Sequence, residues 1–165
     1  YFQNDISDYI EQQGAVSGSS ETKSVNVPKA EIEGFEAELT YDTGVVFAGL
    51  AGSRIRGENK QTGGNLSDIP ADKISVSGGY RFVDAGVEIG GRANMVDRLT
   101  RISSGDEVPG YATFDLFASW DASETLPGLT VNAGIDNILD RNYQSADKGL
   151  YEPGRNVKIS ASMKF

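Results

Sequence analysis

The 165-residue sequence contains no cysteine and no histidine. The absence of cysteine excludes a disulfide scaffold and any thiolate metal site. The absence of histidine removes the commonest general base and the commonest transition-metal ligand, so catalysis through an imidazole is excluded. The sequence also lacks the run of about 18 apolar residues that a transmembrane helix needs.

Positive charge is scarce as well, with 15 basic against 24 acidic side chains and a formal net charge of -9. A nucleic-acid-binding surface needs a basic stripe, so this balance disfavours one. The 20 glycines disfavour a helical bundle, because glycine is a poor helix former.

The pattern that is present has a period of two. Near the end of the chain, Val157, Ile159 and Ala161 alternate with Lys158 and Ser160. Such alternation is typical of strands with one apolar and one polar face. We expect an all-β antiparallel fold with eight strands, at residues 1–12, 25–41, 45–56, 72–82, 85–97, 109–121, 129–138 and 154–165. The abrupt, poorly alternating start favours a fragment of a longer protein.

The connections between these strands alternate in length. The short ones are 42–44, 83–84 and 122–128, and the long polar ones are 13–24, 57–71, 98–108 and 139–153. Short turns at one end and long loops at the other are typical of an outer-membrane β-barrel. Every second strand ends on an aromatic residue, which predicts a membrane girdle of Tyr41, Phe82, Trp120 and Phe165.

The apolar faces carry many small residues, such as Ala93 and Ala133, which would leave voids in the core of a soluble sandwich but are tolerated against lipid. In residues 45–56 we assign Phe47 and Ile55 to the apolar face. The polar faces would line the interior of the barrel and meet a plug. These residues are Glu36, Glu38, Arg54, Arg56, Arg81, Glu88, Arg92 and Asp136.

Five segments, taken in order, resemble the TonB-dependent outer-membrane receptors. They are residues 1–10, 26–36, 109–120, 131–143 and 153–165, the last with its terminal Phe165. The amino-acid sequences of residues 69–74 and 79–82 are similar to those of the haem and haemoglobin branch of this family. The resemblance implies a transmembrane barrel of about 22 strands around a plug domain. Residues 1–165 would then be its last third, with the plug and the earlier strands absent.

The same resemblance implies active transport of an iron-bearing ligand, with haem or haemoglobin favoured and a ferric siderophore next. The implied partners are outer-membrane lipid, the receptor's own plug and remaining strands, the TonB energy-coupling complex and a haem-carrying protein. It implies no enzymatic activity, no cofactor held by this segment and no nucleic-acid partner.

Candidate ligand-binding residues lie in the long loops, where arginine offers forked donors to carboxylates and tyrosine can stack or ligate iron. They are Arg98, Arg101, Arg141, Tyr143, Lys148, Tyr151 and Arg155. The alternative is that these are solvated loop side chains or, for the tyrosines, an upper aromatic belt. Asp136, Asn137 and Asp140 lack the glycine turn of a calcium loop, so we expect no metal site.

Two other functions stay open. Eight strands suffice to close a small barrel, which would serve as an anchor, adhesin or small channel. An outer-membrane enzyme would need a site built from carboxylates alone.

Overall fold

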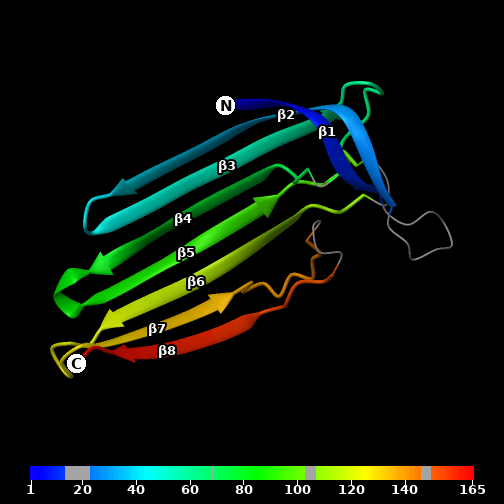
Figure 1. Ribbon diagram of the computed structural model, residues 1–165. Coiled ribbons are helices and arrows are strands. Elements are labelled where there is room, and N and C mark those ends of the chain that lie inside the picture. Colours follow the sequence, from blue (N-terminus) through cyan, green and yellow to red (C-terminus); the bar gives the residue numbers. More distant parts are fainter. Residues whose placement is uncertain (14–22, 68, 103–106, 146–149) are drawn as a thin grey trace.

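The computed structural model describes residues 1–13, 23–67, 69–102, 107–145 and 150–165. They form one antiparallel sheet in which each strand pairs with its neighbours in the chain (Figure 1). The strands are β1 (Phe2–Gln13), β2 (Lys23–Asp42), β3 (Val46–Asn59), β4 (Lys73–Phe82), β5 (Val87–Val96), β6 (Tyr111–Asp121), β7 (Leu129–Asp136) and β8 (Asn156–Met163). All eight predicted strands are confirmed, with ends displaced by a few residues.

Short turns join the strands at one end of the sheet, and the long connections lie at the other (Figure 1). The β2–β3 turn contains Gly44, with φ +83°. The β4–β5 turn is a short 3-10 helix, η1 (Val83–Ala85), ended by Gly86 at φ 62°. Glycine suits these left-handed positions because it has no Cβ. Within the described ranges, no helix is long and apolar enough to span a membrane.

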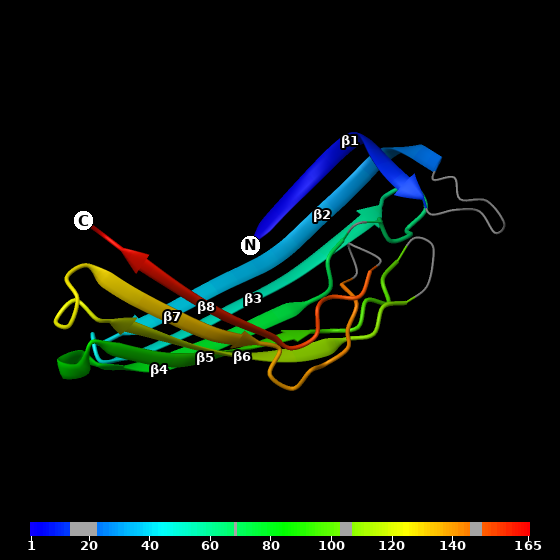
Figure 2. The ribbon, with the colours of Figure 1, turned by 90° about the horizontal axis from the view of Figure 1, so that it is seen from below.

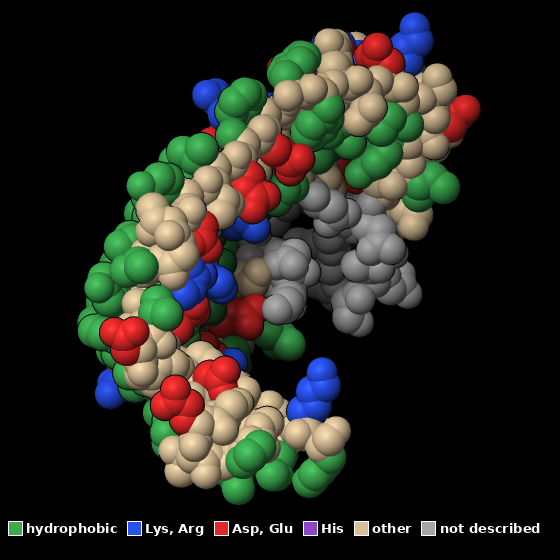
Figure 3. Space-filling model, turned by 90° about the vertical axis from the view of Figure 1, so that its left-hand side faces the viewer, with side chains coloured by type: hydrophobic (Ala, Val, Ile, Leu, Met, Phe, Trp, Pro, Cys, Tyr) green, Lys and Arg blue, Asp and Glu red, His purple; other side chains and the backbone are tan. Residues whose placement is uncertain are grey.

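The sheet is curved, and its convex face is apolar. The register places Leu39, Leu50, Val76, Ala93 and Phe114 in one row across β2 to β6. Leu39 is 66% exposed and Leu50 48%. In Figure 3 the hydrophobic side chains follow the outer side of the arc, and the charged side chains gather mainly on its inner side. A wide exposed apolar band of this kind matches the lipid-facing surface of a barrel.

The prediction assigned the residues of β3 to the wrong faces of the sheet. Because Arg54 lies opposite Phe35 and Leu50 opposite Leu39, the even-numbered residues of β3 share the convex face. Arg54 and Arg56 therefore do not lie on the concave, interior-facing side. Phe47 does lie there.

The eight strands form an open arc. Among the described residues β1 pairs only with β2, and β8 pairs only with β7. In Figure 1 β1 and β8 lie at the two margins of the sheet, and Figure 2 shows both edge strands from below. The eight strands thus do not close on themselves, in contrast to the alternative of a self-contained eight-stranded barrel.

At the long-loop end, β1, β2 and β3 continue beyond the apolar band, and the polarity of their two faces reverses. Leu66 and Ile69, from the connection between β3 and β4, pack with Val27 and Ala30 in a buried cluster. Partly buried Ile6, Tyr9, Ile32 and Ile55 surround it. A dry core thus lies on one side of these strand ends. Because the long loops of outer-membrane barrels are extracellular, we call this part of β1, β2 and β3 the extracellular extension.

Candidate functional site: the concave face and the long loops

The concave face carries the charges at the depth of the apolar band. Arg81 donates one hydrogen bond to Asp42 and one to Glu88, and each is 2.7 Å long. Arg92 lies opposite Asp115 and is exposed. The remaining predicted interior residues, Glu36, Glu38 and Asp136, share this face by register. Their contact with a plug or a transported ligand stays a prediction.

The concave face also carries an aromatic pair that the sequence did not predict. The rings of Phe47 and Phe117 stack with centroids 6.3 Å apart, and the Arg81 guanidinium lies 4.6 Å from the Phe47 centroid. A Cβ at Gly79 would come within 2.3 Å of the Phe47 ring, and one at Gly90 within 2.5 Å of Phe117. The two glycines therefore leave space for the rings. A pair of glycines on adjacent strands was the feature of the sequence that could have indicated this packing.

A polar hollow of about 300 Å³ lies on the concave face toward the loops. Its lining includes Asn94, Asp115 and Tyr143. Asp115 accepts from the Asn94 amide at 3.2 Å, and Asp136 forms an ion pair with Lys158. The hollow offers carboxylate and amide groups near the loop end of the interior.

Asn137, in the segment most similar to the receptor family, is 3% exposed and has φ 49°. Its side-chain amide donates to the Arg141 carbonyl, and its side-chain oxygen accepts from the Arg141 backbone N–H, each at 2.8 Å. Asp140 similarly accepts from the backbone N–H of Arg155 at 2.8 Å. These contacts fold the loop after β7, so the motif has a structural role.

The predicted ligand-binding residues fall into two loops. Tyr143 packs on Tyr111, with ring centroids 4.2 Å apart, and Gln144 forms a bridge with Tyr151, whose side chain is exposed. Tyr143 and Tyr151 belong, with Arg141 and Arg155, to the loop between β7 and β8. Lys148 lies outside the described residues.

Arg98 and Arg101 belong to the loop between β5 and β6. Arg98 is 4.0 Å from Glu107. Arg101 instead turns to Asp72, 3.0 Å away, and so is held by another loop. The structure therefore does not bring the six described candidates together at one site.

Asp72 is the centre of an ion cluster on the convex side, just above the apolar band. Arg56 donates two hydrogen bonds to it, at 2.6 and 2.8 Å, and the Arg54 guanidinium lies 4.0 Å away. The hydrogen bonds from Arg56 hold the pKa of Asp72 below its usual range. The sequence did not predict this cluster of charged side chains.

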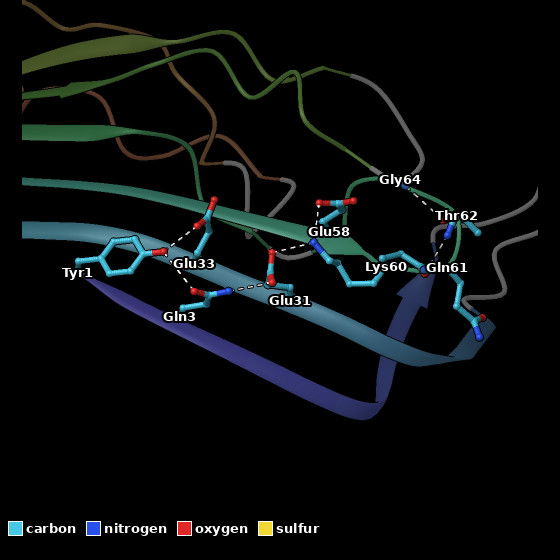
Figure 4. A network of polar contacts seen from close by, with 10 residues as sticks. Tyr1, Gln3, Glu31, Glu33, Glu58, Lys60, Gln61, Thr62 and Gly64 are labelled. Carbon is cyan, nitrogen blue, oxygen red and sulfur yellow. Dashed lines mark hydrogen bonds and ion pairs between the residues drawn. The ribbon is translucent and has the colours of Figure 1, made fainter.

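The outer surface of the extracellular extension is polar (Figure 4). Tyr1 donates to Glu33 at 2.9 Å, and Gln3 donates to Glu31 at 2.9 Å. Lys60 reaches both Glu31, at 2.9 Å, and Glu58, at 3.3 Å. The bond from Lys60 lowers the pKa of Glu31. This hydrogen-bonded surface is suited to water and lies above the lipid-facing band.

The family described as "TonB dependent receptor-like, beta-barrel" matches residues 1–138. The chain belongs to this family. Its members are transport receptors of the outer membrane, which agrees with the apolar convex face and the charged concave face. No cluster of three potential metal-ligating side chains occurs in the described parts of the chain.

Relatives of known function are similar over the whole chain. It is 28% identical to a "Hemin receptor" of Yersinia pestis, covering 100% of this chain and 24% of that protein. It is 29% identical to a "Heme/hemopexin utilization protein C" of Haemophilus influenzae, covering 100% of this chain and 25% of that protein. The chain thus spans about a quarter of the length of these relatives.

Solved structures show the same fold. The "Copper transporter OprC" superposes with a TM-score of 0.86 at 21% identity, over 99% of this chain and 28% of that one. The siderophore receptor PirA from Acinetobacter baumannii gives a TM-score of 0.74 at 20% identity, again over 99% and 28%. At this identity the likeness concerns the fold alone.

Proposed function

We propose that the chain is a section of barrel wall, with its extracellular loops, in an outer-membrane receptor that actively takes up an iron-bearing ligand. Haem, free or delivered by a carrier protein, is the favoured ligand, because the similar relatives named above are haem receptors. A ferric siderophore is the second candidate, favoured by the fold shared with the siderophore receptor.

The observation that carries this proposal is the open sheet with opposite faces. An eight-stranded sheet with two unpaired edges leaves backbone N–H and C=O groups without partners, and lipid does not tolerate such groups. Further strands of the same barrel, pairing with β1 and β8, satisfy both edges. We therefore propose that residues 1–165 are the last third of a larger barrel.

The concave face has the properties required of an interior that holds a plug. Its charges, from Glu36 to Asp136, offer ion-pair partners, and the Phe47–Phe117 pair offers an apolar contact. We propose that the plug rests on this face and that the TonB energy-coupling complex acts on the plug. No covalent step is involved, so the chain itself would need no catalytic group.

For the ligand, the loop between β7 and β8 is the best placed. Its Arg141 and Arg155 would pair with haem propionates through forked donors, and the exposed ring of Tyr151 would pack on the porphyrin. Tyr143, already packed on Tyr111, would support that loop. Arg98 would provide a further cation from the neighbouring loop.

Growth rescue tests the proposal in an iron-starved strain that lacks its own receptors for haem and for ferric siderophores. The full-length receptor should support growth on haem, and variants with Arg141→Gln and Arg155→Gln should need more haem for the same growth. Growth on a ferric siderophore but not on haem would favour the second candidate. Growth on neither, from a receptor that reaches the membrane, would contradict the proposal.

The closed-barrel alternative has its own test. The 165-residue chain, folded in detergent, should lack the heat-sensitive shift in gel mobility that compact barrels show. A compact, heat-modifiable band from this chain alone would favour the anchor or channel function.

A further inference from the structure

A groove of about 580 Å³ lies on the convex face at the top of the apolar band. The row Ala37, Gly52, Ile74 and Met95 crosses its floor from β2 to β5. A Cβ at Gly52 would find its nearest neighbour only at 3.6 Å, so the missing side chain leaves a hollow between larger neighbours. Phe35 bounds the groove beside Arg54. The groove is therefore an apolar channel on a lipid-facing surface.

Guanidinium groups gather at the upper end of this groove. Arg54, Arg56 and Arg101 come from β3 and from the loop after β5, and all three lie within 4.0 Å of the single carboxylate of Asp72. Asp97, whose backbone N–H donates to the Asp72 carbonyl at 2.9 Å, lines the same end. The three guanidinium groups outnumber the two carboxylates of Asp72 and Asp97 at this end.

One of these arginines keeps its donors available. The Arg54 side chain is 71% exposed, and its one ion pair among the described residues is the 4.0 Å approach to Asp72. Arg101 Nε has no hydrogen-bond partner in the part of the chain that the structure describes, but this atom is buried. Arg56, by contrast, already uses its terminal nitrogens on Asp72 and the Ile55 carbonyl. Arg54 is thus the arginine most open to a ligand.

The depth of the cluster identifies the chemistry of that ligand. Below Arg54 the convex face is apolar, from Phe35 to Leu39, and above it the same face carries Glu31 and Glu33. Arg54 therefore stands at the level where hydrocarbon gives way to headgroups, and long cationic side chains extend to this level. Guanidinium binds phosphate through paired donors. A phosphate above an acyl chain matches a cationic rim above an apolar groove.

We propose that this groove binds a phosphate-bearing lipid of the outer leaflet. One acyl chain lies over Gly52 between Phe35 and Ile74, and the phosphate accepts hydrogen bonds from Arg54. The site concerns a lipid that stays with the receptor wall and is separate from the transported ligand. It rests on the proposed function only in requiring that the chain is a barrel wall in the outer membrane.

Native mass spectrometry of the full-length receptor, purified in mild detergent, tests this proposal with defined lipids. Bisphosphorylated lipid A should remain bound, and dephosphorylated lipid A should bind about tenfold more weakly, which corresponds to a loss of about 1.4 kcal/mol. Arg54→Gln should weaken the binding of the phosphorylated lipid by a similar factor. Lys164→Gln, which removes one positive charge beyond the far end of β8, is the matched control and should leave binding unchanged.

A second variant tests the groove itself. Gly52→Leu adds side-chain atoms where space is open, so the receptor should still fold while the lipid is lost. Inorganic phosphate alone should not displace the lipid; displacement at millimolar concentration would reduce the site to a simple anion site and overturn the proposal. Equal binding of both lipid A forms, or unchanged binding by Arg54→Gln and Gly52→Leu, would also overturn it.

Growth on haem separates this inference from the proposed function. The receptor with Arg54→Gln should bind the lipid more weakly but still support growth on haem. A parent receptor that binds lipid A and supports no uptake would contradict the proposed function and leave the lipid site standing.

Discussion

The membrane-level band and the extracellular extension use the same strands with opposite faces. In the band, Leu39 of β2 is 66% exposed on the convex side, and the concave side is charged. In the extension of the same strand, Ala30 is 2% exposed within a dry cluster, and Glu31 and Glu33 lie on the other side. The change of solvent along one strand, from lipid to water, explains the reversal, because apolar groups leave water in both regions.

The comparison also shows why the extension needs the loop between β3 and β4. In the band, lipid covers the apolar side chains, so no protein partner is required. Above the band, Leu66 and Ile69 provide the cover. Buried Glu11 of β1 accepts a hydrogen bond from the Ser67 backbone N–H and so ties this loop to the sheet. The loop is thus a structural lid on the extension.

The largest expected effect comes from removing this cover. Leu66→Ala should cost about 2–5 kcal/mol of local stability, because it leaves a cavity in a protein core. Leu39→Ala should leave the loop intact, since lipid chains fill the space. Hydrogen exchange at residues 64–67 and 69–72 in the full receptor measures both. Equal loosening of the loop by the two variants would break the distinction between the regions.

Adjacent residues of β7 give the next effect. Ala133→Arg places a charge on the convex face in mid-strand and should destabilise the folded receptor by about 2–4 kcal/mol. Asn132→Arg places the same charge on the concave face and should change the stability little. Urea titration of receptor folded in lipid vesicles measures both. A larger loss from Asn132→Arg would reverse the assignment of the faces.

Smaller effects are expected within the concave face. Gly79→Ala should destabilise the receptor by about 1–3 kcal/mol, because the new methyl group meets the Phe47 ring and the Ile89 carbonyl. Gly134→Ala, whose nearest neighbour would be 3.6 Å away, is the control. The same urea titration applies. Equal tolerance of both variants would contradict the packing of the aromatic pair.

The smallest effect concerns acid pH. Because Arg56 lowers the folded-state pKa of Asp72, this carboxylate stabilises the folded state above its unfolded pKa of about 3.9, and the contribution is lost as the pH falls through the folded value. Hydrogen exchange at residues 69–73, corrected for intrinsic rates, should rise in that acid range. Asp72→Asn should remove this pH dependence, and its persistence in that variant would assign it to another group.

The sequence predicted the strands well where one face was plainly polar. In β8, Lys158 and Ser160 alternate with Val157 and Ile159, and the lipid-facing side needs no further information. In β3 both faces are apolar over much of the strand, since Val46, Ala48 and Leu50 alternate with Phe47, Gly49 and Ala51. Only the pairing with β2 settles its faces, and pairing is a long-range property that local alternation does not contain.

The buried and charged clusters at the long-loop end could not be predicted from the sequence, for a related reason. Leu66 lies in a polar loop, and nothing local indicates that it is covered. Asp72 pairs with Arg54 and Arg56 from β3 and with Arg101 from the loop after β5, and all three are distant from it in the sequence. The Asn137 segment was recognised by its resemblance, but its physical role, clamping a loop, became visible only with its hydrogen bonds.

Spin labels placed one at a time along β7, at residues 129–136 of the full receptor in lipid vesicles, test the central claim most directly. The claim that the convex face meets lipid predicts high accessibility to oxygen at positions 129, 131, 133 and 135. It predicts access to a water-soluble nickel chelate, or protection from both reagents beneath a plug, at positions 130, 132, 134 and 136. Oxygen accessibility that is uniform along the strand, or highest at the even positions, would contradict the account.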